Sequence, residues 1–164
     1  MGRSAPAAPR LASGKSGSIA GNVTLAGAGC VFKNHNQIYG DVTLGRSETL
    51  INTGVIHGDV TLGASDSIND SRGKVTDAIT ASSNDTLIYN GLFGEETINK
   101  FVAGSGATHD TIQFAANDFG TFAAVRGAMH QVGADTVITL DAPDSITLVG
   151  VAKSSLVAAD FKFV

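Results

Sequence analysis

The segment GDVTLG occurs twice in this chain, at residues 40–45 and 58–63, and a looser copy, GNVTLAG, covers residues 21–27. The two close copies are 18 positions apart, and the first copy fits the same register if one residue is inserted. Repetition at a short fixed period is typical of folds that stack one unit on the next. A period of about 18 is twice the nonapeptide of parallel β-helices, so it predicts a coil with two short strands and two turns.

The repeated Val-Thr-Leu segment has the alternation of a β-strand, with its first and third residues on one face and its second on the other. Stacked coils would place the aliphatic residues in two inward columns and the threonines in one outward column. The columns are Val23, Val42 and Val60; Leu25, Leu44 and Leu62; and, facing outward, Thr24, Thr43 and Thr61. Asn34, Asn52 and Asp70 also recur at intervals of 18 and are expected to lie one above another at a turn.

Composition agrees with β-structure that is rich in turns. The 164 residues include 20 Gly and no Trp, and 16% of them are charged, with a formal net charge of −4. An acidic chain without a basic stripe is a poor partner for nucleic acid, whereas small hard cations suit it better. Cys30 is the single cysteine, so an intrachain disulfide is excluded, and we expect Cys30 to be a small buried hydrophobe.

The N-terminal stretch contains no apolar run of the length that a signal peptide requires. No segment approaches the ~18 apolar residues of a membrane span, so membrane insertion is not expected. Residues 1–18 are rich in Ala, Ser, Gly and Pro, which predicts a disordered lead-in. The sequence makes no prediction of the oligomeric state.

A shorter pattern begins at residue 48 and continues after residue 63, where the longer repeat becomes less regular; in it an acidic residue is followed by a hydroxyl residue and an aliphatic one. Such a triplet indicates a turn that delivers a carboxylate and then enters a strand. The acidic residues of these triplets are Glu48, Asp66, Asp85, Glu96, Asp110, Asp135 and Asp144.

The segment SSNDTLIYNGLFGEETI, residues 82–98, resembles degenerate copies of the glycine- and aspartate-rich nonapeptide of RTX proteins, the haemolysin-type calcium-binding repeats. The resemblance implies a parallel β-roll whose turns bind Ca²⁺, a hard cation that prefers oxygen ligands. The ligands that it implies here are Asp66, Asp85, Glu96 and Asp110. An alternative interpretation remains open, in which Asp66, Asp85 and Glu96 are turn residues that cap backbone N–H groups.

The last third of the chain resembles the C-terminal region of proteins exported by type I secretion systems. The matching segments are INKF at 98–101, HDTI at 109–112, DTVI at 135–138, DSITL at 144–148 and the ending DFKFV at 160–164. The resemblance implies a type I secretion transporter as partner, a secreted, extracellular location, and an export signal formed by Asp160, Phe161, Lys162, Phe163 and Val164.

Residue patterns predict a cap over the end of the stack. Residues 136–140 and 145–149 alternate like strands and are joined by the turn signal Asp141-Ala142-Pro143-Asp144, which favours an antiparallel pair. Apolar residues at spacings of three to four predict one short helix. They are Phe119, Phe122, Val125 and Met129. A solenoid needs such a cap because its last coil otherwise presents unpaired edge groups.

Catalytic motifs are missing from the sequence: it has no HExxH zinc helix, no GxSxG elbow and no phosphate-binding loop. We therefore predict that the chain is not an enzyme. One catalytic alternative stays open, a polysaccharide-acting β-helix that uses Asp41 and Asp59, one coil apart, as paired carboxylates.

Together these patterns predict an all-β chain, a right-handed parallel β-roll or β-solenoid with a C-terminal antiparallel β cap and one short helix. The expected organisation is a lead-in at 1–18, solenoid repeats at 19–98 and a secretion and capping module at 99–164. The expected function is that of a calcium-binding β-roll protein, or tail of one, which a type I system exports and Ca²⁺ stabilises after export. A metal-free structural or adhesive β-solenoid is the second interpretation.

Overall fold

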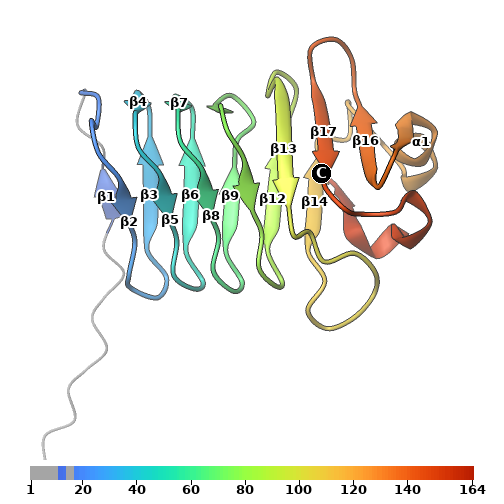
Figure 1. Ribbon diagram of the computed structural model, residues 1–164, viewed down its shortest axis with the longest axis horizontal. Helices are drawn as coiled ribbons and strands as arrows, with labels where there is room; N and C mark the ends of the chain where they lie inside the picture. The colour runs from blue at the N-terminus through green and yellow to red at the C-terminus, as the bar shows by residue number, and fades with distance from the viewer. Residues whose placement is uncertain (1–10, 14–16) are drawn as a thin grey trace, which may run out of the picture.

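The 18-residue period of the sequence corresponds to one coil of the structure. The computed structural model describes residues 11–13 and 17–164, and in this part of the chain the coils follow one another along a single axis from the N-terminus to a module that covers the C-terminal end (Figure 1). The fold is mostly β, with stacked parallel strands and an antiparallel C-terminal part, as the sequence predicts.

The described strands form three sheets, each named here by its number of strands. The seven-stranded sheet contains β1 (Leu11–Ser13), β3 (Val31–Asn34), β6 (Thr49–Asn52), β9 (Ser67–Asn69), β12 (Thr86–Tyr89), β14 (Thr111–Phe114) and β18 (Phe161–Phe163). The three-stranded sheet contains β4 (Gln37–Ile38), β7 (Val55–Ile56) and β10 (Lys74–Val75). The eight-stranded sheet contains β2 (Val23–Thr24), β5 (Val42–Thr43), β8 (Val60–Thr61), β11 (Ile79–Thr80), β13 (Glu95–Asn99), β17 (Ser145–Leu148), β16 (Asp135–Thr139) and β15 (Met129–Val132).

The repeated Val-Thr-Leu segments are in register, as predicted. Val23 pairs with Val42, and Val42 with Val60, while the threonines that follow them pair in the same way and are exposed. Val42 and Val60 are fully buried, and Leu25, Leu44 and Leu62 are buried beside them. The core is therefore a set of aliphatic columns that run along the axis of the stack.

Coils in the first half of the stack have three strands, so the prediction of two strands per coil is wrong for them. The additional strands are β4, β7 and β10, which pair in parallel with one another. Each is two residues long and directs one aliphatic side chain inward: Ile38, Ile56 or Val75. The following coil passes from β12 to β13 through residues 90–94, where Phe93 is buried.

Close packing between coils requires glycine at two turns. A Cβ atom on Gly54 would overlap the carbonyl oxygen of Asn36, and one on Gly63 would overlap the carbonyl oxygen of Gly45. Each pair belongs to successive coils 18 residues apart, so glycine at these positions allows the backbones to stack without a gap.

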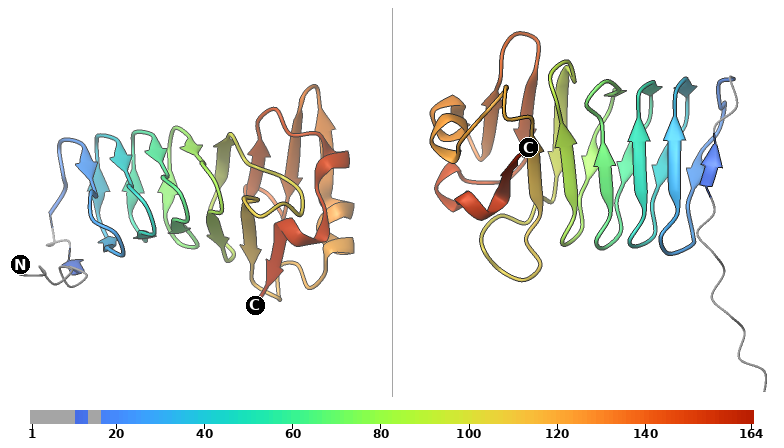
Figure 2. Two further views of the ribbon diagram at one scale, coloured as in Figure 1. Left: turned by 90° about the horizontal axis from the view of Figure 1, so that it is seen from below. Right: turned by 180° about the vertical axis from the view of Figure 1, so that it is seen from behind.

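The C-terminal module closes the stack at the ends of the eight-stranded and the seven-stranded sheets. On one side β17 pairs in parallel with β13 and in antiparallel fashion with β16, which pairs with β15, and this is the antiparallel cap that the sequence predicts. On the other side β14 and β18, both within the predicted module 99–164, extend the parallel seven-stranded sheet. Figure 2 shows the helical segments gathered over this end of the stack.

The predicted short helix is α1 (Phe122–Ala128), and the side chain of Thr121 accepts a hydrogen bond from the backbone N–H of Ala124 at its N-terminus. Two 3-10 turns follow, η1 (Lys153–Ser155) and η2 (Ala158–Asp160). Phe122 of α1 stacks on Phe161 at a ring-centroid distance of 5.6 Å, so the helix covers the aromatic end of the core. In the described part of the chain, α1 and the two turns are too short to cross a membrane.

The lead-in predicted for residues 1–18 lies largely outside the described residues, which begin with 11–13 and resume at 17. Residues 11–13 form β1, which pairs in parallel with β3.

Candidate functional site

Four buried acidic residues, here called the carboxylate ladder, follow one corner of the stack. Each of them directly precedes a strand of the seven-stranded sheet. They are Glu48, Asp66, Asp85 and Asp110. Three of the four predicted calcium ligands, Asp66, Asp85 and Asp110, therefore lie in one column, as their shared triplet indicates.

Both oxygens of each aspartate in the ladder accept backbone N–H groups. Asp66 Oδ1 accepts from the N–H of Glu48 in the preceding coil at 2.8 Å, and its Oδ2 accepts from Gly63 of its own turn at 2.7 Å. Asp85 repeats the arrangement with the N–H groups of Asp66 at 2.9 Å and Ser82 at 2.8 Å. Each aspartate thus closes its own turn and binds the coil before it.

Asp110 continues this pattern at the C-terminal end of the ladder. Its carboxylate accepts from the N–H of Asp85 and from that of Val102, both at 2.8 Å. The ladder thereby joins four successive coils through side-chain to backbone hydrogen bonds.

Backbone conformation explains how these acids come to face inward. The residue before the acid has a positive φ in three turns: 55° at Ser47, 63° at Ser65 and 58° at Asn84. Short polar residues tolerate this left-handed region better than bulky ones. The residue with positive φ directs the N–H and the carboxylate of the following acid toward the interior. There the neighbouring coils supply their hydrogen-bond partners.

Burial makes the carboxylates of Asp85 and Asp110 harder to ionise. Burial raises the pKa of Asp85 to about 6, and the N–H groups of Ser82 and Asp66 oppose the shift. Burial also raises the pKa of Asp110, against the N–H groups of Val102 and Asp85. At Asp85 and Asp110, backbone donors therefore compensate part, and not all, of the cost of burying the charge.

The ladder does not fit a calcium ion. The Asp66, Asp85 and Asp110 oxygens are directed at N–H hydrogens, whose partial positive charge repels a cation. Among the described residues, no group of three or more His, Cys, Asp and Glu side chains has an arrangement that holds a metal. For Asp66 and Asp85 the arrangement is that of the alternative interpretation, carboxylates that cap backbone N–H groups.

Glu96, the fourth predicted ligand, lies in β13 of the eight-stranded sheet, away from the ladder. Its partner is Asp70, which ends a second buried column. In that column Asn34 Nδ2 donates to Asn52 Oδ1 at 2.8 Å, and Asn52 Nδ2 donates to Asp70 Oδ1 at 2.6 Å. Glu96 meets the end of this column, where its carboxyl is hydrogen bonded to that of Asp70.

Asp70 and Glu96 are here called the interior acid pair. The N–H of Val75 donates to Glu96 Oε1 at 3.3 Å. Apart from the contact between the two carboxyls, Asp70 Oδ2, Glu96 Oε2 and the hydroxyl oxygen of Tyr89 are buried without a hydrogen-bond partner among the described residues. Tyr89 and Asp70 are 0% exposed and Glu96 is 3% exposed.

Burial shifts both acids of the pair toward the protonated form. It raises the pKa of Asp70 to about 7, while hydrogen bonds from Asn52 and Glu96 lower it. Burial, followed by the charge of Asp70, raises the pKa of Glu96 to about 9. The two carboxyls therefore share a proton at neutral pH. Burial and the charges on Glu96 and Asp70 also raise the pKa of Tyr89 well above its usual value.

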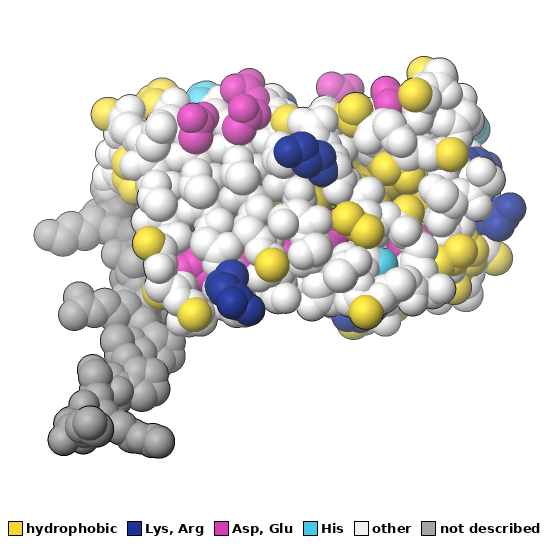
Figure 3. Space-filling view, turned by 60° about the horizontal axis from the view of Figure 1, so that its bottom comes forward, with side chains coloured by type: hydrophobic (Ala, Val, Ile, Leu, Met, Phe, Trp, Pro, Cys, Tyr) yellow, Lys and Arg dark blue, Asp and Glu magenta, His cyan; other side chains and the backbone are white. Residues whose placement is uncertain are grey.

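An exposed polar column lies on a different corner of the stack. Asp41 Oδ1 accepts from the N–H of Asp59 at 3.1 Å, and Asp59 Oδ1 accepts from the N–H of Ala78 at the same distance. Tyr39 and His57 stand two residues before Asp41 and Asp59. The exposed ring of Tyr39 stacks on the ring of His57, with ring centroids 4.9 Å apart. Figure 3 shows acidic side chains gathered along one edge of the N-terminal coils.

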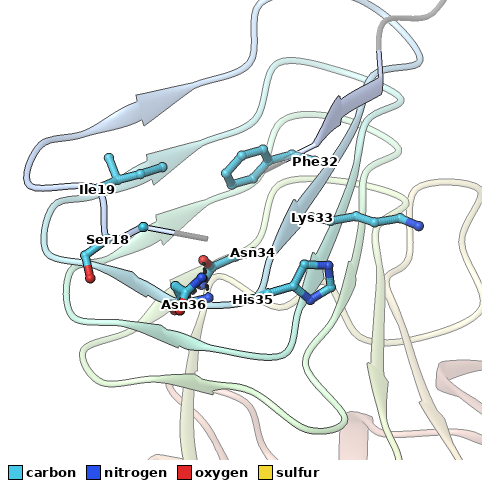
Figure 4. Close-up of a pocket in the computed structure, with 8 residues that line it drawn as sticks. Ser18, Ile19, Phe32, Lys33, Asn34, His35 and Asn36 are labelled. Atoms are coloured by element: carbon cyan, nitrogen blue, oxygen red, sulfur yellow. Dashed lines mark hydrogen bonds between the residues drawn. The ribbon is translucent and has the colours of Figure 1, made fainter. Parts of the chain in front are cut away.

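A hollow marks the N-terminal end of the described stack (Figure 4). Ile19 and Phe32 line it, and Asn34, the first member of the asparagine column, lies at its side. Asn34 is held by its own turn, since its Nδ2 donates to the carbonyl of Asn36 at 3.0 Å. The hollow therefore leads to the beginning of the same column that ends at Asp70.

The residues predicted as the export signal are built into the fold. Asp160 is fully buried, and its carboxylate accepts from the N–H of Gly104 and of Val157, both at 2.7 Å. Phe161 is buried, Lys162 and Val164 are exposed, and Phe163 is half-buried. The N–H of Val164 donates to the carbonyl of Phe114 at 3.1 Å, so the last residues extend the seven-stranded sheet.

Sequence reasoning assigned Asp70 to a turn and did not consider Tyr89. The signal for Asp70 was its place in the column with Asn34 and Asn52, which the structure confirms as a hydrogen-bonded column. The signal for Glu96 was its position two residues before the inward-facing Ile98, because strand alternation places both on the same face. For Tyr89 the alternation of β12 gives the inward direction, whereas its closeness to Glu96 depends on how the coils stack.

No protein family, curated protein or solved structure with which the chain was compared matches it.

Proposed function

We propose that this chain is an extracellular β-solenoid, or the tail of one, which a type I secretion transporter exports unfolded and which folds outside the cell. The observation that carries the proposal is the position of the final residues. Asp160 and Phe161 are buried, and β18 is hydrogen bonded to β14. A transporter that reads this ending as a linear signal must do so before the stack forms, so export would precede folding.

An export assay tests this proposal. The chain is produced in a bacterial host with and without a type I transporter, and the fraction in the medium is measured. We expect transporter-dependent export that is lost when residues 160–164 are removed. Export that does not depend on the transporter, or that survives this removal, would contradict the proposal.

Gly63→Ala is the matched control for that assay. The substitution disturbs the coil contacts of Gly63 with Gly45 and leaves the C-terminal residues unchanged. Since the exported chain is proposed to be unfolded, we expect Gly63→Ala to reach the medium as efficiently as the unsubstituted chain. A loss of export in Gly63→Ala would mean that the transporter requires the folded stack.

Calcium belongs to this proposal as a stabiliser of the folded chain outside the cell, at a place other than the carboxylate ladder. Anything that binds the folded chain and not the unfolded one shifts the equilibrium toward folding. The test is the melting temperature in CaCl₂, in MgCl₂ and in EDTA. We expect Ca²⁺ to raise it and Mg²⁺ to have a smaller effect.

A metal-free structural or adhesive β-solenoid is the second candidate, and the hydrogen bonds of the three ladder aspartates favour it. Because Asp66, Asp85 and Asp110 obtain their partners from the backbone, the stack has an internal means of holding its turns without an ion. A melting temperature that is the same in EDTA and in CaCl₂ would support this candidate over the first.

A further inference from the structure

We propose that Asp70, Glu96 and Tyr89 form a binding site for one hard divalent cation inside the solenoid. The three residues come from successive parts of the stack: Asp70 follows β9, Tyr89 ends β12 and Glu96 lies in β13. The site lies where the three-stranded sheet ends and the coil changes from three strands to two. This inference rests on the calcium part of the proposed function and gives that ion a location.

The distribution of donors separates this site from the three aspartates of the ladder. Each carboxyl of the interior acid pair has one oxygen that accepts a hydrogen bond, from Asn52 Nδ2 in Asp70 and from the N–H of Val75 in Glu96. The second oxygen of each is buried, and among the described residues only the other carboxyl of the pair offers it a proton. A cation can approach these oxygens without displacing a backbone N–H, which it cannot do at Asp66 or Asp85.

Tyr89 supplies the independent indication of a ligand. Its hydroxyl is completely buried and has no partner in the described part of the chain. Buried hydroxyl groups of this kind nearly always have one, because leaving them unpaired costs free energy. The charges of Glu96 and Asp70 raise the pKa of this hydroxyl, so it lies within their field.

A shared proton satisfies this cluster only in part. One proton between Glu96 and Asp70 serves a single O–H···O contact and leaves one negative charge in the core, with the Tyr89 oxygen still unpaired. A divalent cation would neutralise both carboxylates and accept the phenol oxygen as a neutral ligand. The cluster thus offers three hard oxygens and two negative charges to one ion.

Among hard divalent cations, calcium suits the site better than magnesium. Calcium accepts irregular geometry and mixed carboxylate and neutral oxygen ligands. Magnesium requires a near-ideal octahedron and gives up its water reluctantly, which disfavours it at a buried site.

Binding requires one proton to leave. The proton that the two carboxyls share passes to solvent, both carboxylates bind the ion, and the phenol remains protonated. One H⁺ is therefore released for each ion bound.

Terbium luminescence gives a sharp test, because the chain has two tyrosines and no tryptophan. Tb³⁺ binds at oxygen-rich sites and emits when a nearby tyrosine is excited. We expect sensitised emission from the unsubstituted chain, from Tyr39→Phe, and not from Tyr89→Phe. Emission that is absent in the unsubstituted chain, that persists in Tyr89→Phe, or that disappears in Tyr39→Phe would overturn the proposal; the last result would place the ion at the exposed column beside Asp41.

Melting temperatures complete the test and do not depend on luminescence. We expect the Ca²⁺-induced rise to disappear in Asp70→Asn/Glu96→Gln and to persist in Asp41→Asn/Asp59→Asn, with circular dichroism confirming that both variants fold. A rise that persists in Asp70→Asn/Glu96→Gln would overturn this site and leave the calcium part of the proposed function intact. If Ca²⁺ does not raise the melting temperature of the unsubstituted chain, both this site and the calcium part of the proposed function are overturned. The export assay tests the remaining part of the proposed function independently of these results.

Discussion

The backbone N–H of Glu48 donates to Asp66 Oδ1 across 2.8 Å, although the two residues lie in different coils, 18 positions apart. The same contact recurs from Asp66 to Asp85 and from Asp85 to Asp110. Charge-assisted hydrogen bonds of this type are stronger than neutral ones, and here they join each coil to the next. The ladder is therefore a main source of cohesion along the axis of the stack.

Asp66→Asn tests the ladder directly. The amide keeps one acceptor oxygen and places an NH₂ group against the N–H of either Gly63 or Glu48, which leaves that buried donor unpaired. We expect a loss of about 1–3 kcal/mol in the free energy of unfolding. Urea unfolding followed by circular dichroism measures it. Asp59→Asn on the exposed column is the control and should change little, so equal losses in the two variants would refute the ladder's role.

Gly63→Ala tests the close stacking of coils. Its Cβ would overlap the carbonyl oxygen of Gly45, so the two coils must separate. We expect a loss of roughly 3 kcal/mol or more, or failure to fold. Gly21→Ala is the control, since a Cβ there meets nothing within 4 Å. A Gly63→Ala chain as stable as Gly21→Ala would show that the coils are less tightly stacked than described.

Stability should fall as the pH rises from about 4 to 9 in EDTA. Burial raises the pKa of Asp85 to about 6, of Asp70 to about 7 and of Glu96 to about 9. Between the usual carboxyl pKa near 4 and these values, the folded chain keeps protons that the unfolded chain has released, so each unit of pH costs folding free energy. Urea unfolding at several pH values measures the slope.

Asp70→Asn/Glu96→Gln is the control for this pH dependence, because it removes the two groups with the highest pKa values. The decline above pH 7 should then become shallower, while the part due to Asp85 remains. A free energy of unfolding that increases between pH 5 and 9 in EDTA would contradict the burial of uncompensated carboxyls.

Phe161→Ala should weaken the cap independently of export. Phe161 is buried and stacks between Phe114 and Phe122, at ring-centroid distances of 6.5 and 5.6 Å. Deleting a buried aromatic ring costs about 3–5 kcal/mol. Thermal unfolding measures the loss, with Lys162→Ala as the neighbouring exposed control. Similar melting temperatures for the two variants would mean that β18 does not hold the cap.

The stacked solenoid could be predicted because its signal is periodic identity. Val42 and Val60 belong to identical hexapeptides, so any regular stacking brings them into register, and the structure confirms this pairing. The third strand of the coils in the first half of the stack could not be predicted in the same way. Gln37–Ile38 and Val55–Ile56 contain a single inward aliphatic residue each, and a pair of residues cannot display an alternation.

The acidic triplets can be identified in the sequence, but we did not predict from the sequence that their carboxylates face the core. Glu48 stands two residues before the inward Leu50, so strand alternation already places it on the core side. What the sequence cannot supply is the partner of each acid. Glu96 meets Asp70, 26 positions earlier, only because the coil between them has lost its third strand, and this follows from the three-dimensional path of the chain.

Residues 46–63 contact the coil before them and the coil after them through the same set of positions. A chain that carried this segment in tandem duplicate would gain one complete layer of about 4.8 Å, with all hydrogen bonds and aliphatic columns continued. The length of such a rod can therefore change by whole coils when a gene segment that encodes a coil before Asp70 is duplicated. The sequence after Asp70 must then be kept unchanged.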